Sequence, residues 1–546
     1  MKRLFGNTAK LKADQIRRLG NLYRRRLPVQ FLITSELALE IGRLSQELRR
    51  QIGLLINRQG KVVYVIIGDH QGLMLPDTSD YRVAPDRLRG LRCIHTHLNA
   101  ESLTRDDLTD LAFLRLDLIA AIVIDDEGQP LEIHAGHILP RASDGLPYEI
   151  LPPIKPNRLD IGCLDLIQAL ENELAQIRSA ADTDPGKELA LLISVTTASR
   201  AMAEDSLAEL KELAISSGMQ VVGTIRQHRK TKNPRFLMGL GKLKDLAIIA
   251  LQKGATVIVF DQELNPSQIR SITDRIELKV IDRTQLILDI FAQRAQSREG
   301  KLQVELAQLK YLLPRLITKN TAMSRLTGGI GGRGPGETRL EINRRRVRDT
   351  IVRLEKQTSN VGKQRKQQRA RRQKRGLPII SIIGYTNAGK STLLNTLTKS
   401  NVRAESRLFA TLDPASKRLR FPRDVEVIIT DTVGFIKDLP KDLLVAFRAT
   451  LEALESADLL LHVIDISNPR FEDQIESVER ILRELNLNHI PIIRILNKQD
   501  RMDPSVLGPL RQRLDGTAVS ANDRSTLPPL IGMLEDSILK IRPSMV

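Results

Sequence analysis

Apolar runs alternate with helical patterns over residues 188–290, and this alternation predicts a small parallel α/β domain. Four runs have the length and composition of strands: Leu189–Val195, Met219–Thr224, Ala255–Phe260 and Leu278–Ile281. Between them lie segments with helical spacing of apolar residues, near Ala203–Ser216, Gly241–Lys253 and Pro266–Arg275. Strands that alternate with helices build βαβ units, in which the strands are parallel.

The same alternation returns over residues 377–546 and predicts a second parallel α/β domain. Its strand-like runs are Pro378–Ile383, Val425–Thr430, Leu459–Ile466, Pro491–Leu496 and Thr517–Ser520. The residues after the last run are enough for one more helix.

Residues 291–376 have a different pattern, which predicts a helical hairpin. Five leucines at spacings of three and four form one helical stripe: Leu302, Leu306, Leu309, Leu313 and Leu316. The glycine-rich segment Gly328–Gly336 is not expected to be helical. A second long, charged helix should begin near Glu337.

The first 187 residues are less regular. Residues 1–26 are a basic segment without clear periodicity, and residues 27–140 have a mixed α/β pattern. Ser35–Leu55 is typical of a helix that leads into a strand, whereas Lys61–Ile67 and Leu118–Ile124 are typical of strands. Prolines then crowd a short span, so we predict a proline-rich linker and helix over residues 141–187.

Charge changes the interpretation of the hairpin. The 546-residue chain has a net charge of +19, and Arg339–Arg375 has fifteen Lys or Arg against three acids, a net +12. This stretch has no aromatic residue, so we expect phosphate contacts rather than base stacking. A solvated helix face is the simpler alternative, but the charge exceeds what solubility requires.

The remaining composition favours a soluble, cytoplasmic protein without a membrane span. No run approaches the roughly 20 apolar residues of a membrane helix, and the first residues lack a secretory signal. The two cysteines, Cys93 and Cys163, imply no disulfide framework. We expect a monomer.

Gly384–Ser391 matches the phosphate-binding pattern G-x-x-x-x-G-K-[ST] between a strand and a helix. The glycines permit a tight wrap, and backbone N–H groups face the phosphates. Lys390 should reach the β- and γ-phosphates, and Ser391 should bind Mg²⁺. An ordinary glycine-rich turn is the alternative. The expected nucleotide contacts are Gly384, Tyr385, Thr386, Asn387, Ala388, Gly389, Lys390, Ser391 and Thr392.

Two more motifs follow strands of the same predicted domain. The first motif consists of Asp431, Thr432, Val433 and Gly434. Asp431 should hold Mg²⁺ through water, and the Gly434 amide should contact the γ-phosphate. The second is Asn497, Lys498, Gln499 and Asp500, with an accessory base loop at Ser520, Ala521 and Asn522.

The second motif selects the base. The Asp500 carboxylate can accept hydrogen bonds from guanine N1–H and its exocyclic amine, which adenine cannot offer in that arrangement. Lys498 can lay its alkyl stem on the purine. The sequence therefore predicts a site for GTP and GDP.

A switch threonine is expected at Thr411, which would close on Mg²⁺ when the γ-phosphate is present. Its neighbours Phe409, Ala410, Leu412 and Asp413 complete the segment. Phe435 stands where Ras-like GTPases carry a water-orienting glutamine. We therefore predict slow intrinsic hydrolysis that needs a partner, and the residue that activates water is not identified.

These motifs, together with segments 331–338, 340–347, 438–440 and 446–451, resemble the HflX family of ribosome-associated GTPases over about residues 188–535. The resemblance implies binding to the large ribosomal subunit, ribosome splitting, rescue or biogenesis, and hydrolysis stimulated by the ribosome. It also implies that the hairpin contacts rRNA. The candidates for that contact are Arg333, Arg339, Arg344, Arg345, Arg346 and Arg348.

The expected fold is therefore a multidomain α/β protein with a C-terminal P-loop GTPase domain. A basic helical hairpin, a small parallel α/β domain and an extra N-terminal α/β domain precede it. The alternative function is an RNA-remodelling NTPase that uses the first α/β domain. The glycine-rich segment Phe236–Leu243 could be a second nucleotide site, but it lacks P-loop spacing and favours a turn that leads into a helix.

His95, His97 and Asp107 form a separate candidate site. Their spacing resembles the His-x-His…Ser-x-x-Asp signature of JAMM/RadC-like domains, which implies Zn²⁺ ligands.

The N-terminal segment departs from that signature at the expected general base. Arg50 and Gln51 stand where a glutamate is expected, and Glu47 is out of register. Three alternatives stay open: a catalytically dead domain, a metal-binding but inactive domain, and an active protease.

Overall fold

The structure is a computed structural model. It describes residues 3–70, 72–76, 78, 81, 87–99, 101–143, 146–181, 187–276, 278–316, 339–373, 377–398, 408–409, 415–436 and 454–541. These residues form two compact units, the first from residues 1–207 and 218–281 and the second from residues 208–217 and 282–546. Each unit is described by itself.

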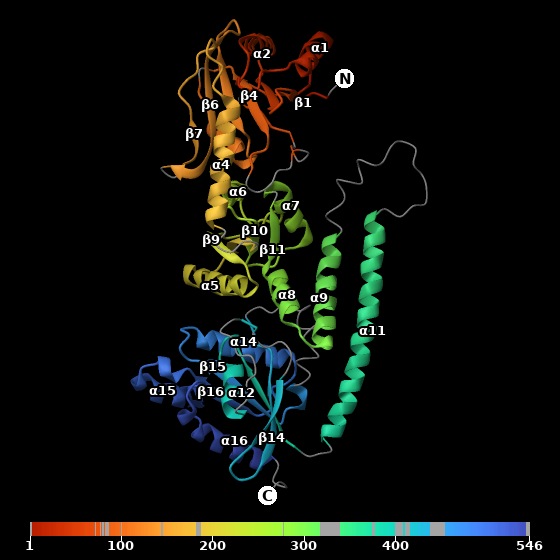
Figure 1. The fold of residues 1–546 in the computed structure, drawn as a ribbon, viewed down its shortest axis with the longest axis vertical. Helices are drawn as coiled ribbons and strands as arrows, with labels where there is room; N and C mark the ends of the chain where they lie inside the picture. Colours follow the sequence, from red (N-terminus) through yellow and green to blue (C-terminus); the bar gives the residue numbers. More distant parts are fainter. Residues whose placement is uncertain are drawn as a thin grey trace. The chain divides into compact units, whose positions relative to one another are not determined.

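The first unit begins with a seven-stranded sheet in the order β1-β3-β2-β4-β5-β6-β7 (Figure 1). Its strands are β1 (Phe5–Gly6), β2 (Ile52–Asn57), β3 (Val62–Ile67), β4 (Leu91–His97), β5 (Leu118–Ile124), β6 (Pro130–Ser143) and β7 (Leu146–Ile150). Its helices are α1 (Ala13–Asn21), α2 (Ser35–Leu48), α3 (Arg105–Phe113) and α4 (Cys163–Ala181), with a short 3₁₀ turn, η1 (Leu22–Arg24). The predicted helix α2 and strands β2, β3 and β5 are confirmed.

Two predicted boundaries in this region are wrong. The segment 1–26 supplies the edge strand β1, because Phe5 and Gly6 pair with Ile66 and Ile67 of β3. Residues 141–150 are not a linker, because β7 pairs antiparallel with β6. The prolines misled the prediction because proline is tolerated in strands at a sheet edge, where fewer N–H groups must be paired.

The centre of this sheet is buried on both faces. Every residue of β4 and β5 is buried, and β4 pairs parallel with β5 and antiparallel with β2. Helix α2 begins where the Thr34 side chain accepts a hydrogen bond from the Leu37 N–H, and it ends at Arg49 in the left-handed conformation. Helix α3 begins at Thr104 in the same way.

The four-stranded sheet confirms the predicted βαβ pattern. Its order is β11-β10-β8-β9, and β9 and β10 both lie parallel to β8. The strands are β8 (Leu189–Thr196), β9 (Gln220–His228), β10 (Val257–Phe260) and β11 (Lys279–Asp282). The helices are α5 (Arg200–Ser216), α6 (Leu240–Gln252) and α7 (Pro266–Ile276).

The second unit contains α8 (Arg283–Arg294) and a hairpin of α9 (Arg298–Leu316) and α11 (Arg339–Gln373). The hairpin helices lie side by side and contact each other, and α11 extends beyond the end of α9 (Figure 1). The leucine stripe located α9 correctly, but the face that is most buried carries Val304, Ala307 and Tyr311. The predicted glycine-rich segment lies outside the described residues.

The rest of the second unit is a six-stranded sheet in the order β13-β14-β12-β15-β16-β17. Its strands are β12 (Ile379–Gly384), β13 (Ala415–Arg420), β14 (Glu426–Asp431), β15 (Leu459–Asp465), β16 (Ile492–Asn497) and β17 (Gly516–Ala518). The helices are α12 (Lys390–Thr398), α14 (Phe471–Glu484), α15 (Pro504–Leu514) and α16 (Pro528–Ile541), with 3₁₀ turns η3 (Leu454–Ser456), η4 (Gln499–Arg501) and η5 (Arg524–Thr526). Strand β13 was not predicted and is antiparallel to β14.

Parallel pairing brings the carboxyl ends of β12, β14, β15 and β16 to one edge of this sheet. Ligands of open α/β sheets bind at that edge. Among the described residues, no helix has both the length and the apolar character needed to cross a membrane.

Candidate functional site

The phosphate-binding loop follows β12 in a strained backbone. Gly384, Asn387 and Gly389 all have positive φ, of 147°, 63° and 96°. A Cβ at Gly384 would lie 2.3 Å from the Val463 carbonyl oxygen, and one at Gly389 would lie 2.2 Å from Asn497 Nδ2. Both glycines are therefore required by close approach of neighbouring strands and loops.

Lys390 begins α12 and folds back over this loop. Its ammonium donates to the Tyr385 carbonyl oxygen at 2.7 Å. Burial lowers the pKa of Lys390 to about 8, although the nearby Asp431 carboxylate acts to raise it. A buried cation held at a loop of backbone amides is suited to a phosphate.

Ser391 and Asp431 meet beside the lysine. The Ser391 hydroxyl donates to Asp431 Oδ2 at 2.6 Å, and Asp431 is fully buried at the end of β14. Gly434 passes so close that a Cβ there would lie 2.9 Å from Lys390 Nζ. Four of the residues predicted to bind phosphate or metal, Lys390, Ser391, Asp431 and Gly434, thus lie together.

The loop after β14 is hydrogen-bonded to the phosphate-binding loop. The Phe435 N–H donates to the Gly384 carbonyl at 3.0 Å, and the Thr386 N–H donates to the Phe435 carbonyl at 2.7 Å. The Phe435 side chain is buried. The Thr432 hydroxyl donates to the Ile382 carbonyl, and Val433 is also buried.

Asn497, at the end of β16, forms hydrogen bonds with two other loops. Its Nδ2 donates to the Ala388 carbonyl at 2.8 Å, and its Oδ1 accepts from the Ala521 N–H at 2.9 Å. The Ala521 carbonyl accepts a hydrogen bond from the Thr396 hydroxyl of α12. Asn497 therefore positions the phosphate-binding loop and the accessory loop at Ser520–Asn522 relative to each other.

Lys498 and Asp500 occupy the turn that follows. Lys498 has a φ of 66° and forms an ion pair with Asp465 at 2.6 Å, a partner that the sequence did not indicate. Asp500 lies in η4 beside Gln499 and is exposed. Its carboxylate has no hydrogen bond or ion pair within the described part of the chain, so both oxygens can accept from a base.

Some of the other residues predicted for this site are described by the structure, and some are not. Thr392 lies in the first turn of α12 and Asn522 is exposed at the accessory loop. Ala410, Thr411, Leu412 and Asp413 lie outside the described residues, whereas Phe409 is described and buried.

The sequence missed residues of the second unit that contact these loops. The Tyr385 hydroxyl donates to Glu209 of α5, which also pairs with Arg283 of α8. The Leu408 N–H donates to Ser216 Oγ at 3.2 Å. His462 lies on β15 beside Ile383, and its pKa is lowered to about 3 by burial and by Arg494 and Lys390. These residues have no motif around them, so no sequence signal identified them.

The arginines predicted to contact rRNA are partly described. Arg345, Arg346 and Arg348 are exposed on α11, and Arg344 is half-buried. Arg339 begins α11, but its side chain and the whole of Arg333 lie outside the described residues.

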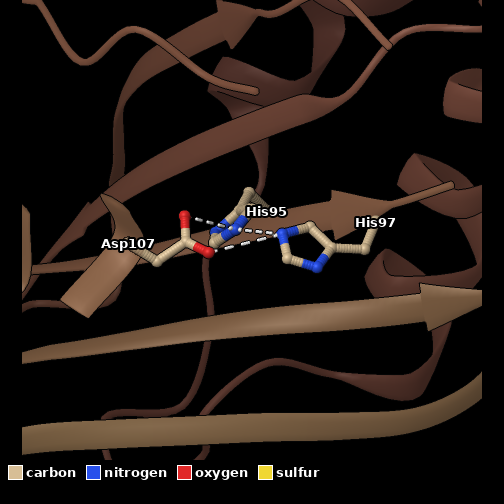
Figure 2. A group of neighbouring side chains, drawn as sticks. All are labelled: His95, His97 and Asp107. Atoms are coloured by element: carbon tan, nitrogen blue, oxygen red, sulfur yellow. Dashed lines mark hydrogen bonds and ion pairs between the residues drawn. The ribbon is translucent and has the colours of Figure 1, made fainter. Parts of the chain in front are cut away.

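The N-terminal candidates His95, His97 and Asp107 come together in the first unit (Figure 2). The two histidines stand two positions apart on β4, so their side chains lie on the same face of the sheet. Asp107 comes from the first turn of α3. Their side chains converge on one point.

The glycine-rich segment before α6 is a turn that leads into a helix, as predicted. Phe236, Leu237 and Met238 are buried in the core of the four-stranded sheet, and Gly239 is the N-cap of α6.

Comparison with known proteins agrees with the described site. Residues 204–292 match the family model described as GTP-binding GTPase N-terminal, and residues 294–372 match GTP-binding GTPase Middle Region. Residues 379–498 match the model described as 50S ribosome-binding GTPase.

Curated relatives and solved structures extend the comparison. GTPase HflX of Caldanaerobacter subterraneus is 45% identical over 354 residues, which are 65% of this chain and 81% of that protein. GTPase HflX of Escherichia coli is 45% identical over 59% of this chain and 75% of that protein. A GTP-binding protein from Sulfolobus solfataricus, solved with GDP, is 25% identical with a TM-score of 0.35, over 66% of this chain and all of that one. The chain therefore belongs to the HflX family and is a GTPase.

Proposed function

We propose that this GTPase requires Mg²⁺, binds the large ribosomal subunit through rRNA, and acts in ribosome splitting, rescue or biogenesis, with hydrolysis stimulated by the ribosome. The observation that carries the proposal is the cationic face of α11. Support also comes from the matched model, whose description names binding to the 50S subunit.

Helix α11 divides into an apolar side and a basic side. Ile351 and Leu354 are buried, and Glu355 pairs with Lys310 of α9 at 2.7 Å. Arg345, Arg346 and Arg348 are exposed elsewhere on the surface of the helix. Because the apolar side packs within the hairpin, these exposed guanidinium groups are the part of α11 that solvent-borne phosphates can reach.

The Mg²⁺ proposal rests on the donor set. Hydroxyl and carboxylate oxygens are the ligands that Mg²⁺ prefers, alongside substrate phosphates and water. Ser391 and Asp431 supply these oxygens 2.6 Å apart, next to Lys390. Ser391 would ligate the ion directly, Asp431 would hold it through water, and Thr411 would add a ligand in the GTP state.

The dependence on a partner rests on Phe435. Its side chain is buried and its backbone is bonded to the phosphate-binding loop. A phenyl ring cannot orient water, so the intrinsic rate should be low. A group from the ribosome, or one ordered by it, would complete the site.

Co-sedimentation with ribosomal subunits tests the partner. We expect the GTPase to pellet with large subunits when loaded with a non-hydrolysable GTP analogue and to do so less with GDP. Charge reversal at Arg345, Arg346 and Arg348 to Glu should abolish pelleting, because phosphate contacts dominate such binding. Nucleotide affinity should be unchanged.

The matched control reverses three exposed cations elsewhere in the second unit: Arg483→Glu, Arg511→Glu and Lys540→Glu. It changes the net charge equally but leaves α11 intact. Equal loss in both variants would mean that only total charge matters. Equal pelleting of the unchanged protein in both nucleotide states would contradict the proposal.

A further inference from the structure

Two histidines and one aspartate of the first unit meet on one sheet face. His95 Nε2 lies 2.9 Å from His97 Nε2 and 3.1 Å from Asp107 Oδ1, and His97 Nε2 lies 3.5 Å from Asp107 Oδ2. Both histidines are buried and the aspartate side chain is 16% exposed. Figure 2 shows the three groups pointing at one another from β4 and α3.

His97 and Asp107 are each held by a neighbouring residue. His97 Nδ1 lies 3.1 Å from the Glu101 carbonyl oxygen, which can only accept a hydrogen bond. A neutral His97 that donates there keeps its Nε2 lone pair for the cluster. Thr104 holds Asp107 Oδ2 with its backbone N–H at 2.8 Å and its hydroxyl at 2.6 Å, which leaves Oδ1 facing His95.

The sheet leaves room for His95. Its neighbour on β2 is Gly53 and its neighbour on β5 is Ala121, so both flanking positions on this face are small. The polar contacts of His95 are on its Nε2 side, because Nδ1 is buried and has no partner among the described residues. The cluster itself therefore sets the direction of this ring.

The distances suit one shared cation. In a tetrahedral site with Zn–N and Zn–O bonds of about 2.0–2.2 Å, the ligand atoms lie about 3.3 Å from one another. His95 Nε2 lies 2.9 Å from His97 Nε2 and 3.1 Å from Asp107 Oδ1, slightly closer than that value, and the other carboxylate oxygen, Oδ2, lies 3.5 Å from His97 Nε2. Two imidazoles and one carboxylate favour Zn²⁺ and similar transition ions over Mg²⁺ or Ca²⁺.

We propose that His95, His97 and Asp107 form a binding site for one divalent transition-metal ion of the Zn²⁺ class, with a fourth position open to water or an exogenous donor. This site is distinct from the nucleotide site, because it lies in the other unit and shares no residue with it.

The site binds metal without the base that peptide hydrolysis needs. Arg50, at the position expected for a glutamate, donates to the carbonyls of Asn7 and Ala9. The Glu47 carboxylate accepts hydrogen bonds from Gln15 and Arg18. Neither side chain is available to activate a metal-bound water.

Cobalt titration of the full-length, tag-free protein tests the site. The protein is first treated with a chelator and then saturated with Mg²⁺ and GDP, so that the nucleotide site is filled. A single equivalent of Co²⁺ should give the visible absorption of a four- or five-coordinate ion, and Zn²⁺ should displace it. Thr104→Val should weaken binding about 10- to 100-fold, because it frees Asp107 without removing a ligand.

Ligand variants and a matched control decide the assignment. His97→Gln and Asp107→Asn should abolish the Co²⁺ spectrum. His134→Gln changes a histidine of β6 on the same sheet face and should leave the spectrum intact. If a ligand variant does not fold, Thr104→Val still tests the site. Absence of the spectrum in the unchanged protein, or an equal spectrum in Asp107→Asn, would overturn the proposal and leave a purely hydrogen-bonded cluster.

Discussion

The ring of Phe409 meets the ring of Phe291 edge to face, with centroids 4.6 Å apart and planes at 77°. Phe409 belongs to the segment predicted to close on the γ-phosphate, and Phe291 belongs to α8. Both rings are buried. If this segment moves when the nucleotide changes, either the contact between the two rings must break or α8, which lies outside the G domain, must move with the segment.

We expect this pair to be energetically coupled. Phe291→Leu and Phe409→Leu should each lower the free energy of unfolding, measured on the transition that GDP shifts. The double variant should lose less stability than the sum of the two single losses. The coupling should be about 0.5–1.5 kcal/mol, the usual value for an edge-to-face pair. Phe260→Leu, at a buried phenylalanine of β10, is the control and should combine additively with Phe409→Leu.

Asp500→Asn should exchange the base preference. Losing the carboxylate removes hydrogen bonds to a charged acceptor, each worth about 1.5–3 kcal/mol, so GDP affinity should fall at least tenfold. The new amide can donate to the C2 carbonyl of xanthine, so xanthosine diphosphate should bind better than GDP. Calorimetry with both nucleotides checks this. Asp503→Asn alters a nearby carboxylate that caps α15, and it should change neither affinity.

The Lys390 pKa predicts coupling between nucleotide binding and proton uptake. Burial lowers this pKa from 10.5 to about 8 in the nucleotide-free protein, and bound phosphates should restore it. Above pH 8 the free protein holds a neutral amine that must gain a proton to bind. GDP affinity should therefore fall about tenfold per pH unit between pH 8 and 10.5.

Calorimetry at pH 8.5 in buffers of different ionisation enthalpy measures this uptake. Lys390→Arg carries a permanent charge, so it should show no uptake from this position. Ionisation of the base itself would affect both proteins equally. Identical pH profiles for the two would rule out the lysine as the source.

Gly389→Ala should disconnect the phosphate-binding loop from β16. The new methyl group would lie 2.2 Å from Asn497 Nδ2, and the backbone there has a φ of 96°. Asn497 would have to move and give up its bond to Ala388 or Ala521. GDP affinity should drop by at least tenfold, roughly 1.4 kcal/mol or more. Gly241→Ala, in α6, meets no atom within 4 Å and should bind GDP normally.

The strands that the sequence predicted well are those buried on both faces. β8, β10, β12 and β15 are mostly apolar runs, because helices cover parallel sheets on both sides. The edge strand β7 contains Pro147, and the edge strand β13 contains Lys417, Arg418 and Arg420, so neither has such a run. Their assignment depends on pairing with β6 and β14, which the local sequence does not encode.

The nucleotide site was predictable to the extent that its residues are contiguous. Gly384–Ser391 and Asn497–Asp500 each carry their chemistry within one short segment. The contact between Tyr385 and Glu209 spans 176 residues, and the ion pair of Lys498 with Asp465 depends on two neighbouring strand ends. Such partners follow from the fold and not from a motif.

The outermost strand β13 has a consequence for self-association. Its side chains Lys417, Arg418 and Arg420 are exposed at one end of the six-stranded sheet, and the opposite end is closed by the three-residue strand β17. A second copy that tried to extend the sheet through β13 would bring like charges against one another, and one that used β17 would find few free backbone groups. Both edge strands of the sheet thus disfavour the addition of strands from other molecules, which leads to aggregation.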